Sequence, residues 1–328
     1  MSRPGGDTPN PARVYDYVLN GPDDARYSLP ADRAFARALI KADPTAVERT
    51  RRNRAFVVTV ARRAAQAGIR QFADLGCGLP ATPGVPAAVL EAAPGARVAA
   101  VDHDPFVVAR WASAAISGVT PLLADISDPD TALKTLPLDL DEPVCVLLGS
   151  VLHLLGDPET AVDTFKAAIS ARSWMAISVP RYRSAGQLAW TQAATRMPVR
   201  NLSAADLEKM LSGMNLLEPG VVEAKCWMQG ICHEPRGGHT LVGAAVKPVL
   251  AADETQRGPG GRLHCLAALP PAGFHRISDE LGHVPVAFQG RRPGRDLLAE
   301  PEQDGTITRP CGGDRLAGLL QCLYGIAV

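Results

Sequence analysis

Five short apolar runs alternate with segments of helical pattern between residues 70 and 180, and this alternation constrains the fold more than any other feature. The apolar runs occupy residues 70–76, 96–104, 120–126, 143–150 and 173–180, and the helical segments occupy 84–93, 105–117, 129–136 and 158–171. Strands that alternate with helices at this spacing predict a mostly parallel sheet with helices on both faces. The run VCVLLG is continuously apolar, as a strand buried on both faces requires. The predicted fold class is therefore α/β.

The segments before this region are expected to be helical. Residues 1–12 are rich in Pro and Gly and are predicted to form a disordered arm, and 13–19 read as a short helical segment. Residues 31–41 and 45–67 have helical periodicity, with an apolar stripe in the second. Asp43 before Pro44 suits the start of that helix, and Gly68 suits a left-handed position just past its end.

The segments after residue 180 are less regular. A polar loop is expected at 181–200, followed by a helix with Ser203 as its N-cap. Residues 221–228 and 239–248 read as two further strands, which would form an antiparallel edge of the sheet. Residues 249–328 are rich in Gly, Pro and Arg, and we expect a poorly ordered extension there. The predicted core therefore spans residues 70–248.

Composition gives no support to several classes of protein. The chain has 34 basic and 34 acidic side chains, so its net charge gives no support to a nucleic-acid-binding function. The seven cysteines form no C-x-x-C pair, so no zinc site is predicted. The N-terminus lacks an apolar signal region, and no apolar stretch approaches the roughly 20 residues that span a bilayer. We expect a soluble, cytoplasmic protein without a metal centre.

A glycine-rich turn follows the first predicted strand. Asp74, Gly76 and Gly78 form a D-x-G-x-G pattern, in which the glycines let the backbone turn sharply and approach a ligand. An acid two residues before the first glycine suits the amino group of S-adenosylmethionine and would be badly placed beside a pyrophosphate. The alternative is an ordinary turn between strand and helix. Asp102, at the end of the second strand, is placed where a ribose diol is normally held, although it could also be a solvated loop acid.

Polar residues also follow the third and fourth strands. Asp125 could accept a hydrogen bond from an adenine amine while Ile126 packs on the ring, or Asp125 could instead cap the next helix. Gly149 and Ser150 follow the fourth strand, where ligands bind in open α/β sheets. His153 could be a general base, but we prefer a scaffold role because no partner acid is identifiable.

These signals resemble a class I S-adenosylmethionine-dependent methyltransferase. Several shorter sequence segments resemble, more specifically, an actinobacterial family of methyltransferases that is described by a domain of unknown function. The matching segments are residues 12–19 (ARVYDYVL), 31–33 (ADR), 53–56 (NRAF), 68–72 (GIRQF), 74–80 (DLGCGLP) and 101–105 (VDHDP). The resemblance covers about residues 10–248. One departure is NGPDD at 20–24, where the family usually has Gly-Gly-Lys-Asp-Asn.

The resemblance implies a Rossmann-like seven-stranded sheet of order 3-2-1-4-5-7-6, with an N-terminal helical lid over residues 13–69. It places Asp74, Gly76 and Gly78 at the methionine side of the cofactor, Asp102 at the ribose and Asp125 at the adenine. Within the lid, Arg13 would reach the cofactor carboxylate. The other residues expected around the cofactor are Tyr15, Asp16, Asn53, Arg54, His103, Ile126, Gly149 and Ser150.

The expected function is methyl transfer from S-adenosylmethionine to a small-molecule acceptor that the family does not identify. If the acceptor is a hydroxyl, His153 and Tyr15 are the candidate catalytic residues. Two alternatives remain open at this point. One is a non-catalytic S-adenosylmethionine-binding sensor or scaffold, and the other is an NAD-dependent oxidoreductase. The oxidoreductase is disfavoured by Asp74 in the loop and by the lack of a strict third glycine. Neither an oligomeric state nor the methylated atom follows from the sequence.

Overall fold

The structure, a computed structural model, describes residues 8–182, 184–229 and 240–249. These residues form an eight-stranded sheet of order β3-β2-β1-β4-β5-β8-β6, with β7 paired to β8. The strands are β1 (Gln71–Leu75), β2 (Arg97–Asp102), β3 (Val119–Leu123), β4 (Val144–Gly149), β5 (Trp174–Pro180), β6 (Asn215–Leu216), β7 (Val222–Glu223) and β8 (Thr240–Val246). The first five strands are parallel, and β8 is antiparallel to β5. The predicted order is confirmed, because the last long strand lies between the fifth and the sixth, and the short β7 is an addition.

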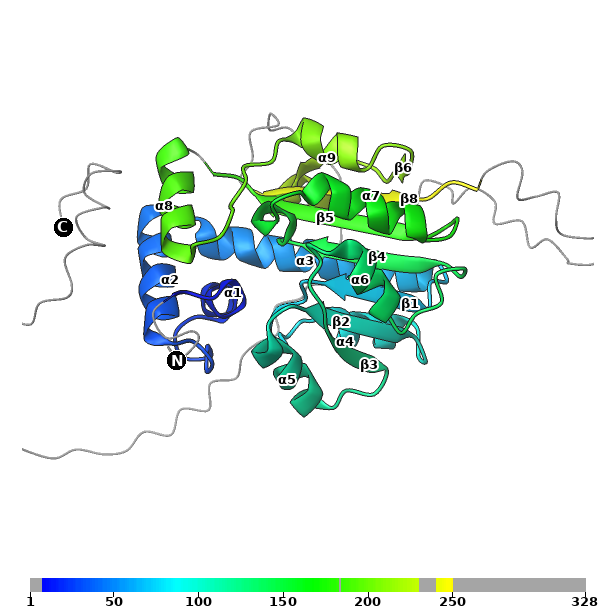
Figure 1. The fold of residues 1–328 in the computed structure, drawn as a ribbon, viewed down its shortest axis with the longest axis horizontal. Coiled ribbons are helices and arrows are strands. Elements are labelled where there is room, and N and C mark those ends of the chain that lie inside the picture. The colour runs from blue at the N-terminus through cyan, green and yellow to red at the C-terminus, as the bar shows by residue number, and fades with distance from the viewer. Residues whose placement is uncertain (1–7, 183, 230–239, 250–328) are drawn as a thin grey trace, which may run out of the picture. The chain divides into compact units, whose positions relative to one another are not determined.

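Helices cover both faces of this sheet (Figure 1). One face packs against α3 (Ala46–Gln66), α4 (Val85–Ala92), α5 (Pro105–Ala114) and α10 (Ala224–Gln229). The other face packs against α6 (Pro129–Thr135), α7 (Pro158–Ala168) and α9 (Ala204–Met210). Strand residues alternate between the two clusters, with Phe72 in one and Ala73 in the other, as the period of two in a strand requires.

A third cluster of buried apolar residues joins two N-terminal helices to a helix that follows β5. These helices are α1 (Pro11–Asn20), α2 (Pro30–Ala42) and α8 (Ala185–Thr195), which gather at one side of the sheet in Figure 1. Phe35 of α2 stacks on Trp190 of α8 with ring centroids 4.7 Å apart. Asn10 caps α1 by accepting a hydrogen bond from the Arg13 backbone N–H. The helical part therefore begins at Pro11, two residues inside the arm expected at 1–12.

The loop predicted at 181–200 is wrong for residues 185–195, which form α8. Its sequence contains few strongly apolar residues, so no periodicity marked it. Buried Thr191 and Thr195 satisfy their hydroxyls within the helix, on the carbonyls of Gln187 at 2.9 Å and of Thr191 at 2.7 Å. Ser184 caps the first turn by accepting from the Gln187 N–H. Polar residues can therefore face the interior here, a tertiary effect that composition does not show.

The strand predicted at 221–228 is also wrong beyond β7, because the chain turns there into α10. The cause is packing on α3. Trp227 is 1% exposed and lies edge-on to Phe56, with ring centroids 4.8 Å apart, while the Arg63 guanidinium lies 4.9 Å from its ring centroid. The strand predicted at 239–248 is confirmed over 240–246 as β8.

Asp43 does not start α3 as predicted. It ends α2, and its carboxylate accepts hydrogen bonds from the Thr45 N–H and hydroxyl at 3.0 and 2.6 Å. Because Thr45 is held in this way, α3 begins at Ala46. Cys77 and Cys145 are free and buried, whereas Cys226 is disulfide-bonded. The extension expected beyond Val249 and the connection at 230–239 lie outside the described residues.

Candidate functional site

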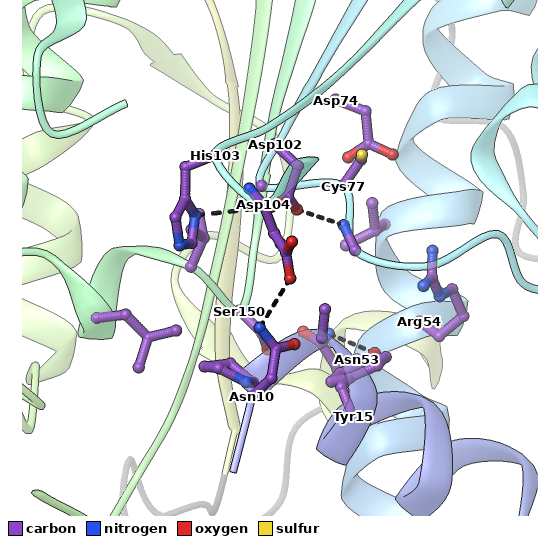
Figure 2. Close-up of a pocket in the computed structure, with 18 residues that line it drawn as sticks. Asn10, Tyr15, Asn53, Arg54, Asp74, Cys77, Asp102, His103, Asp104 and Ser150 are labelled. Atoms are coloured by element: carbon purple, nitrogen blue, oxygen red, sulfur yellow. Dashed lines mark hydrogen bonds and ion pairs between the residues drawn. The ribbon is translucent and has the colours of Figure 1, made fainter. Parts of the chain in front are cut away.

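A cavity of about 110 Å³ lies at the carboxyl ends of β1, β2 and β4. This edge is where open α/β sheets bind ligands. Figure 2 shows the acidic strand-end residues Asp74 and Asp102 facing Tyr15 and Asn53 of the helical part. The sequence-predicted residues that line the cavity are Tyr15, Asn53, Arg54, Asp74, Gly76, Gly78, Asp102, His103, Gly149 and Ser150.

The glycine turn forms the floor of this cavity. Gly76 and Gly78 have φ values of +68° and +63°, in the left-handed region that side chains disfavour. A Cβ on Gly76 would also come within 2.6 Å of Val151, so a larger residue could not fit there. The turn is held against β2, because the N–H groups of Gly76 and Cys77 both donate to the Val101 carbonyl at 2.8 and 3.0 Å. The positive φ and the close Val151 side chain therefore both favour glycine at position 76.

Asp74 is a carboxyl group with unusual electrostatics. It is 6% exposed, and burial raises its pKa from 3.8 to about 6. The Arg54 guanidinium opposes this rise, and the negative charge of Asp102 adds to it. Arg54 itself lines the cavity, and its Nε is buried without a hydrogen-bond partner in the described structure. The cavity is thus lined by a carboxylate and by a guanidinium, and each can bind a ligand group of opposite charge.

Asp102 ties together the loops that follow β1 and β2. One of its carboxylate oxygens accepts from the Gly78 N–H at 3.0 Å, and the other accepts from the Asp104 N–H at 3.0 Å. His103 lies beside it, with Nδ1 3.6 Å from the carboxylate. Burial is the largest influence on Asp102 and raises its pKa. Because each oxygen keeps a further lone pair, Asp102 can still accept hydrogen bonds from two ligand hydroxyls.

The helical side of the cavity is made by α1 and α3. The side-chain amide of Asn53 donates to the Tyr15 hydroxyl at 2.9 Å, and that hydroxyl donates to the Thr50 carbonyl at 3.2 Å. Asn10 donates to the Asp104 carboxylate at 2.9 Å, across the mouth of the cavity (Figure 2). The bonds of Tyr15 join α1 to α3, and the bond of Asn10 joins the start of α1 to the loop after β2, so α1 forms one wall of the cavity.

Four predicted residues do not line this cavity. Arg13 is paired with the buried Asp32, with Nε 2.6 Å from the carboxylate. Asp16 is buried in α1 and accepts from the Asn20 side chain at 2.8 Å. Asp125 is exposed, with its carboxylate accepting from the Ser127 N–H, and Ile126 is buried in the sheet core. Their proposed contacts with a cofactor stay predictions.

His153 lines a second, adjoining cavity rather than the first. It is 8% exposed, and burial lowers its pKa to about 3, so the imidazole is neutral at physiological pH. Its Nδ1 is buried and has no hydrogen-bond partner in the described part of the chain. Such a ring is a weak proton acceptor, because a base is effective when its pKa lies near the working pH.

Several lining residues were not identified as such by sequence reasoning. Asn10 and Asp104 were read as part of an arm and as a helix cap, and both act as caps while also lining the cavity. Arg54 was named only through the family resemblance. Its neighbour Asn53 could not have suggested it, because adjacent residues of a helix point in different directions, and which arginine of α3 turns toward the cavity depends on how that helix packs. None of the signals in the sequence indicated the second cavity.

This fold and site are those of a Rossmann-like methyltransferase, with the acidic strand ends and glycine turn at the carboxyl edge of the sheet. The sequence model of the S-adenosyl methyltransferase family matches residues 5–247, and the chain belongs to that family. The protein is therefore an S-adenosylmethionine-dependent methyltransferase, as the resemblance implied. No curated protein matches the sequence.

Solved structures agree with this assignment. A candidate methyltransferase from Thermobifida fusca YX is 27% identical with a TM-score of 0.65, covering 74% of this chain and 96% of that one. A DUF574 family protein from Streptomyces avermitilis MA-4680 is 28% identical with a TM-score of 0.65, covering 74% of this chain and 99% of that one. Among the helices described here, none is long and apolar enough to cross a membrane.

Proposed function

We propose that S-adenosylmethionine binds in the first cavity and that its methyl group passes to a small-molecule acceptor in the adjoining one. The observation that carries this proposal is that one cavity is lined by the buried carboxyl group of Asp74 and by Arg54, whose Nε has no hydrogen-bond partner among the described residues. Arg54 suits the carboxylate of the cofactor's methionine part, and the buried Asp74 suits its ammonium group. This assignment gives Arg54 the role that the family resemblance gave to Arg13. Arg13 already forms an ion pair with Asp32.

The remaining contacts follow from the same cavity. Asp102 would hold the ribose hydroxyls, and Gly76 and Gly78 would let the ligand approach the backbone of the turn. When bound, the cofactor supplies an electrophilic methyl group: an acceptor lone pair forms the bond to the methyl carbon, the carbon–sulfur bond breaks and its electrons stay on sulfur. The protein's task is then to align the acceptor and exclude water.

Tyr15 is proposed to position the acceptor, because it lines both cavities and its hydroxyl is held by Asn53 and Thr50. His153 is proposed to bind the acceptor through a hydrogen bond as a neutral ring. With its pKa lowered to about 3, His153 is poorly suited to remove a proton. An acceptor that is already ionised or intrinsically nucleophilic fits such a site best.

Calorimetric titration tests this proposal. S-adenosylhomocysteine should bind the wild type, binding should fall at least about tenfold in Asp102→Asn, because hydrogen bonds to a charged group are lost, and NAD should not bind. Glu142→Gln is the matched control and should bind as the wild type does, because Glu142 is exposed and precedes the amino end of β4, whereas the cavity lies at the carboxyl end of that strand. Binding of NAD in place of S-adenosylhomocysteine would contradict the proposal and favour an oxidoreductase.

A further inference from the structure

The second cavity is enclosed by elements from both ends of the described chain. Its walls come from α1, α2, α3 and α8, together with the carboxyl end of β5 and the first residue of β8. Its volume is about 160 Å³, close to that of the roughly 150 Å³ engineered cavity known to hold benzene. Its apolar lining includes Val14, Val18, Phe35, Leu39 and Pro180. The space therefore suits a molecule with one ring or a short hydrocarbon body.

This cavity joins the cofactor cavity through a shared wall. Pro11, Tyr15, Asn53, Ser150 and Leu154 line both. Ser150 has a φ of +55°, a strained value for a residue with a side chain, and its N–H donates to Ser178. Strain of this kind is common at functional sites. A molecule in the second cavity would lie next to whatever the first one binds.

The charged residues lining the second cavity are both basic. Arg49 is already compensated, because its guanidinium lies 2.6 Å from the Asp43 carboxylate. Arg181 has no ion pair with a described residue, and its buried Nε has no hydrogen-bond partner there. No Asp or Glu is among the lining residues of the described chain. Arg181 is half-buried, so its guanidinium can pair with an anionic ligand in the cavity through charge-assisted hydrogen bonds.

A second polar group in the cavity also lacks a partner. His153 is 8% exposed, lines the cavity and leaves Nδ1 without a hydrogen bond from the described residues. Tyr182, whose pKa is raised by burial, lies across from it with ring centroids 6.4 Å apart. Buried polar groups are nearly always hydrogen-bonded in folded proteins, so an orphan beside a cavity indicates a ligand that completes it.

We propose that the second cavity is the acceptor site, and that it takes a small organic acid of about one-ring size whose anionic group pairs with Arg181. The apolar body of the acceptor packs against Val14, Val18 and Phe35, and His153 completes its polar contacts. This inference rests on the proposed function for the identity of the neighbouring cofactor. It explains why the site needs no strong base, because an acid arrives already ionised at neutral pH.

Paired probes of the same shape and different charge test this assignment. Benzoate and benzamide are titrated by ligand-detected NMR against the full chain, with and without saturating S-adenosylhomocysteine. Benzoate should bind at least about tenfold more tightly than benzamide, because only benzoate makes a charge-assisted pair with a guanidinium. In Arg181→Gln this preference should disappear, whereas Arg51→Gln, at an exposed position of α3, should keep it.

A second variant fills the cavity without touching the charge. Thr191→Phe, on the α8 wall, should abolish binding of both probes while S-adenosylhomocysteine still binds, which also shows that the variant is folded. Equal binding of the two probes, or a benzoate preference that survives in Arg181→Gln, would overturn the inference. So would the failure of benzoate to bind a protein that binds S-adenosylhomocysteine. If S-adenosylhomocysteine itself did not bind, the proposed function would be contradicted instead. The benzoate and benzamide titrations without S-adenosylhomocysteine would still test the acid-binding cavity.

Discussion

At the scale of single residues, Asp74 illustrates a conflict between stability and binding. Its pKa is about 6 in the folded protein and 3.8 ordinarily, so above pH 6 its buried charge destabilises the folded state. Asp74→Asn removes that charge and should stabilise the ligand-free protein at pH 7 by about 2 to 3 kcal/mol, at about 1.4 kcal/mol per pKa unit. Thermal unfolding should show the gain at pH 7 and its loss toward pH 4, where both side chains are neutral. A lower melting temperature at pH 7 would contradict this account.

The same carboxyl group should make cofactor binding depend on pH. An ammonium group pairs with the ionised form of Asp74, which is lost as pH falls below about 6. The dissociation constant of S-adenosylhomocysteine should therefore rise by about tenfold per pH unit below 6, measured by calorimetry from pH 8 to 5. Asp74→Asn should bind weakly with no such dependence. His103→Gln should retain this pH dependence. If the dependence disappeared in His103→Gln, then His103 and not Asp74 would be its source.

Two arginines of the helical part are predicted to have separate roles. Arg54→Gln should weaken S-adenosylhomocysteine binding by roughly tenfold to a hundredfold, because it removes a charge-assisted hydrogen bond. It should cost less stability than Arg13→Gln, and that cost arises because the ionised Asp74 loses a nearby positive charge. Arg13→Gln should instead destabilise the fold by about 3 to 5 kcal/mol, because it leaves the fully buried Asp32 without its partner. Chemical denaturation and calorimetry on both variants separate the two roles. Loss of binding in a stable Arg13→Gln protein would restore the contact that the family resemblance implied.

At the scale of elements, α8 lines the second cavity and packs against α2 through an aromatic stack. Trp190 is 2% exposed and stacks on Phe35 of α2. Trp190→Ala should cost about 3 to 5 kcal/mol, as large-to-small changes in a core do. Because α8 supplies no residue to the cofactor cavity, S-adenosylhomocysteine should still bind while benzoate does not. Equal loss of both ligands would mean that the two cavities are not separable.

At the scale of the whole molecule, the residues described as lining the two cavities run from Asn10 to Thr240. The described chain continues past β8 to Lys247, whose ammonium donates to the Lys166 and Ile169 carbonyls at 2.9 and 2.6 Å. The family match also ends at residue 247. A chain shortened to residues 1–249 should therefore bind S-adenosylhomocysteine as the full chain does, in a direct calorimetric comparison. Weaker binding would give residues 250–328 a role in the site.

Much of the sheet and part of the cavity could be predicted from the sequence, because their signals are local. Continuous apolar runs such as β4 mark strands covered on both faces, and Ser203 and Asp104 are short-range helix caps. Asp74 and Asp102 lie at the carboxyl ends of β1 and β2, and Gly76 follows β1 directly; the parallel pairing of these strands brings all three residues to one edge. The resemblance to a known family added Tyr15 and Asn53, which lie in helices and carry no local signal of their own.

The amino-acid order was enough to predict the alternation of strands and helices, the acidic residues at the strand ends and, through the family resemblance, the order of the sheet. The tertiary structure decided which arginine enters the first cavity, because Arg13 and Arg54 look alike in sequence and differ in whether Asp32 already compensates the charge. It also decided α8, α10 and the second cavity. These depend on burial between segments more than a hundred residues apart, such as Phe35 and Trp190, and no local pattern encodes a contact at that separation.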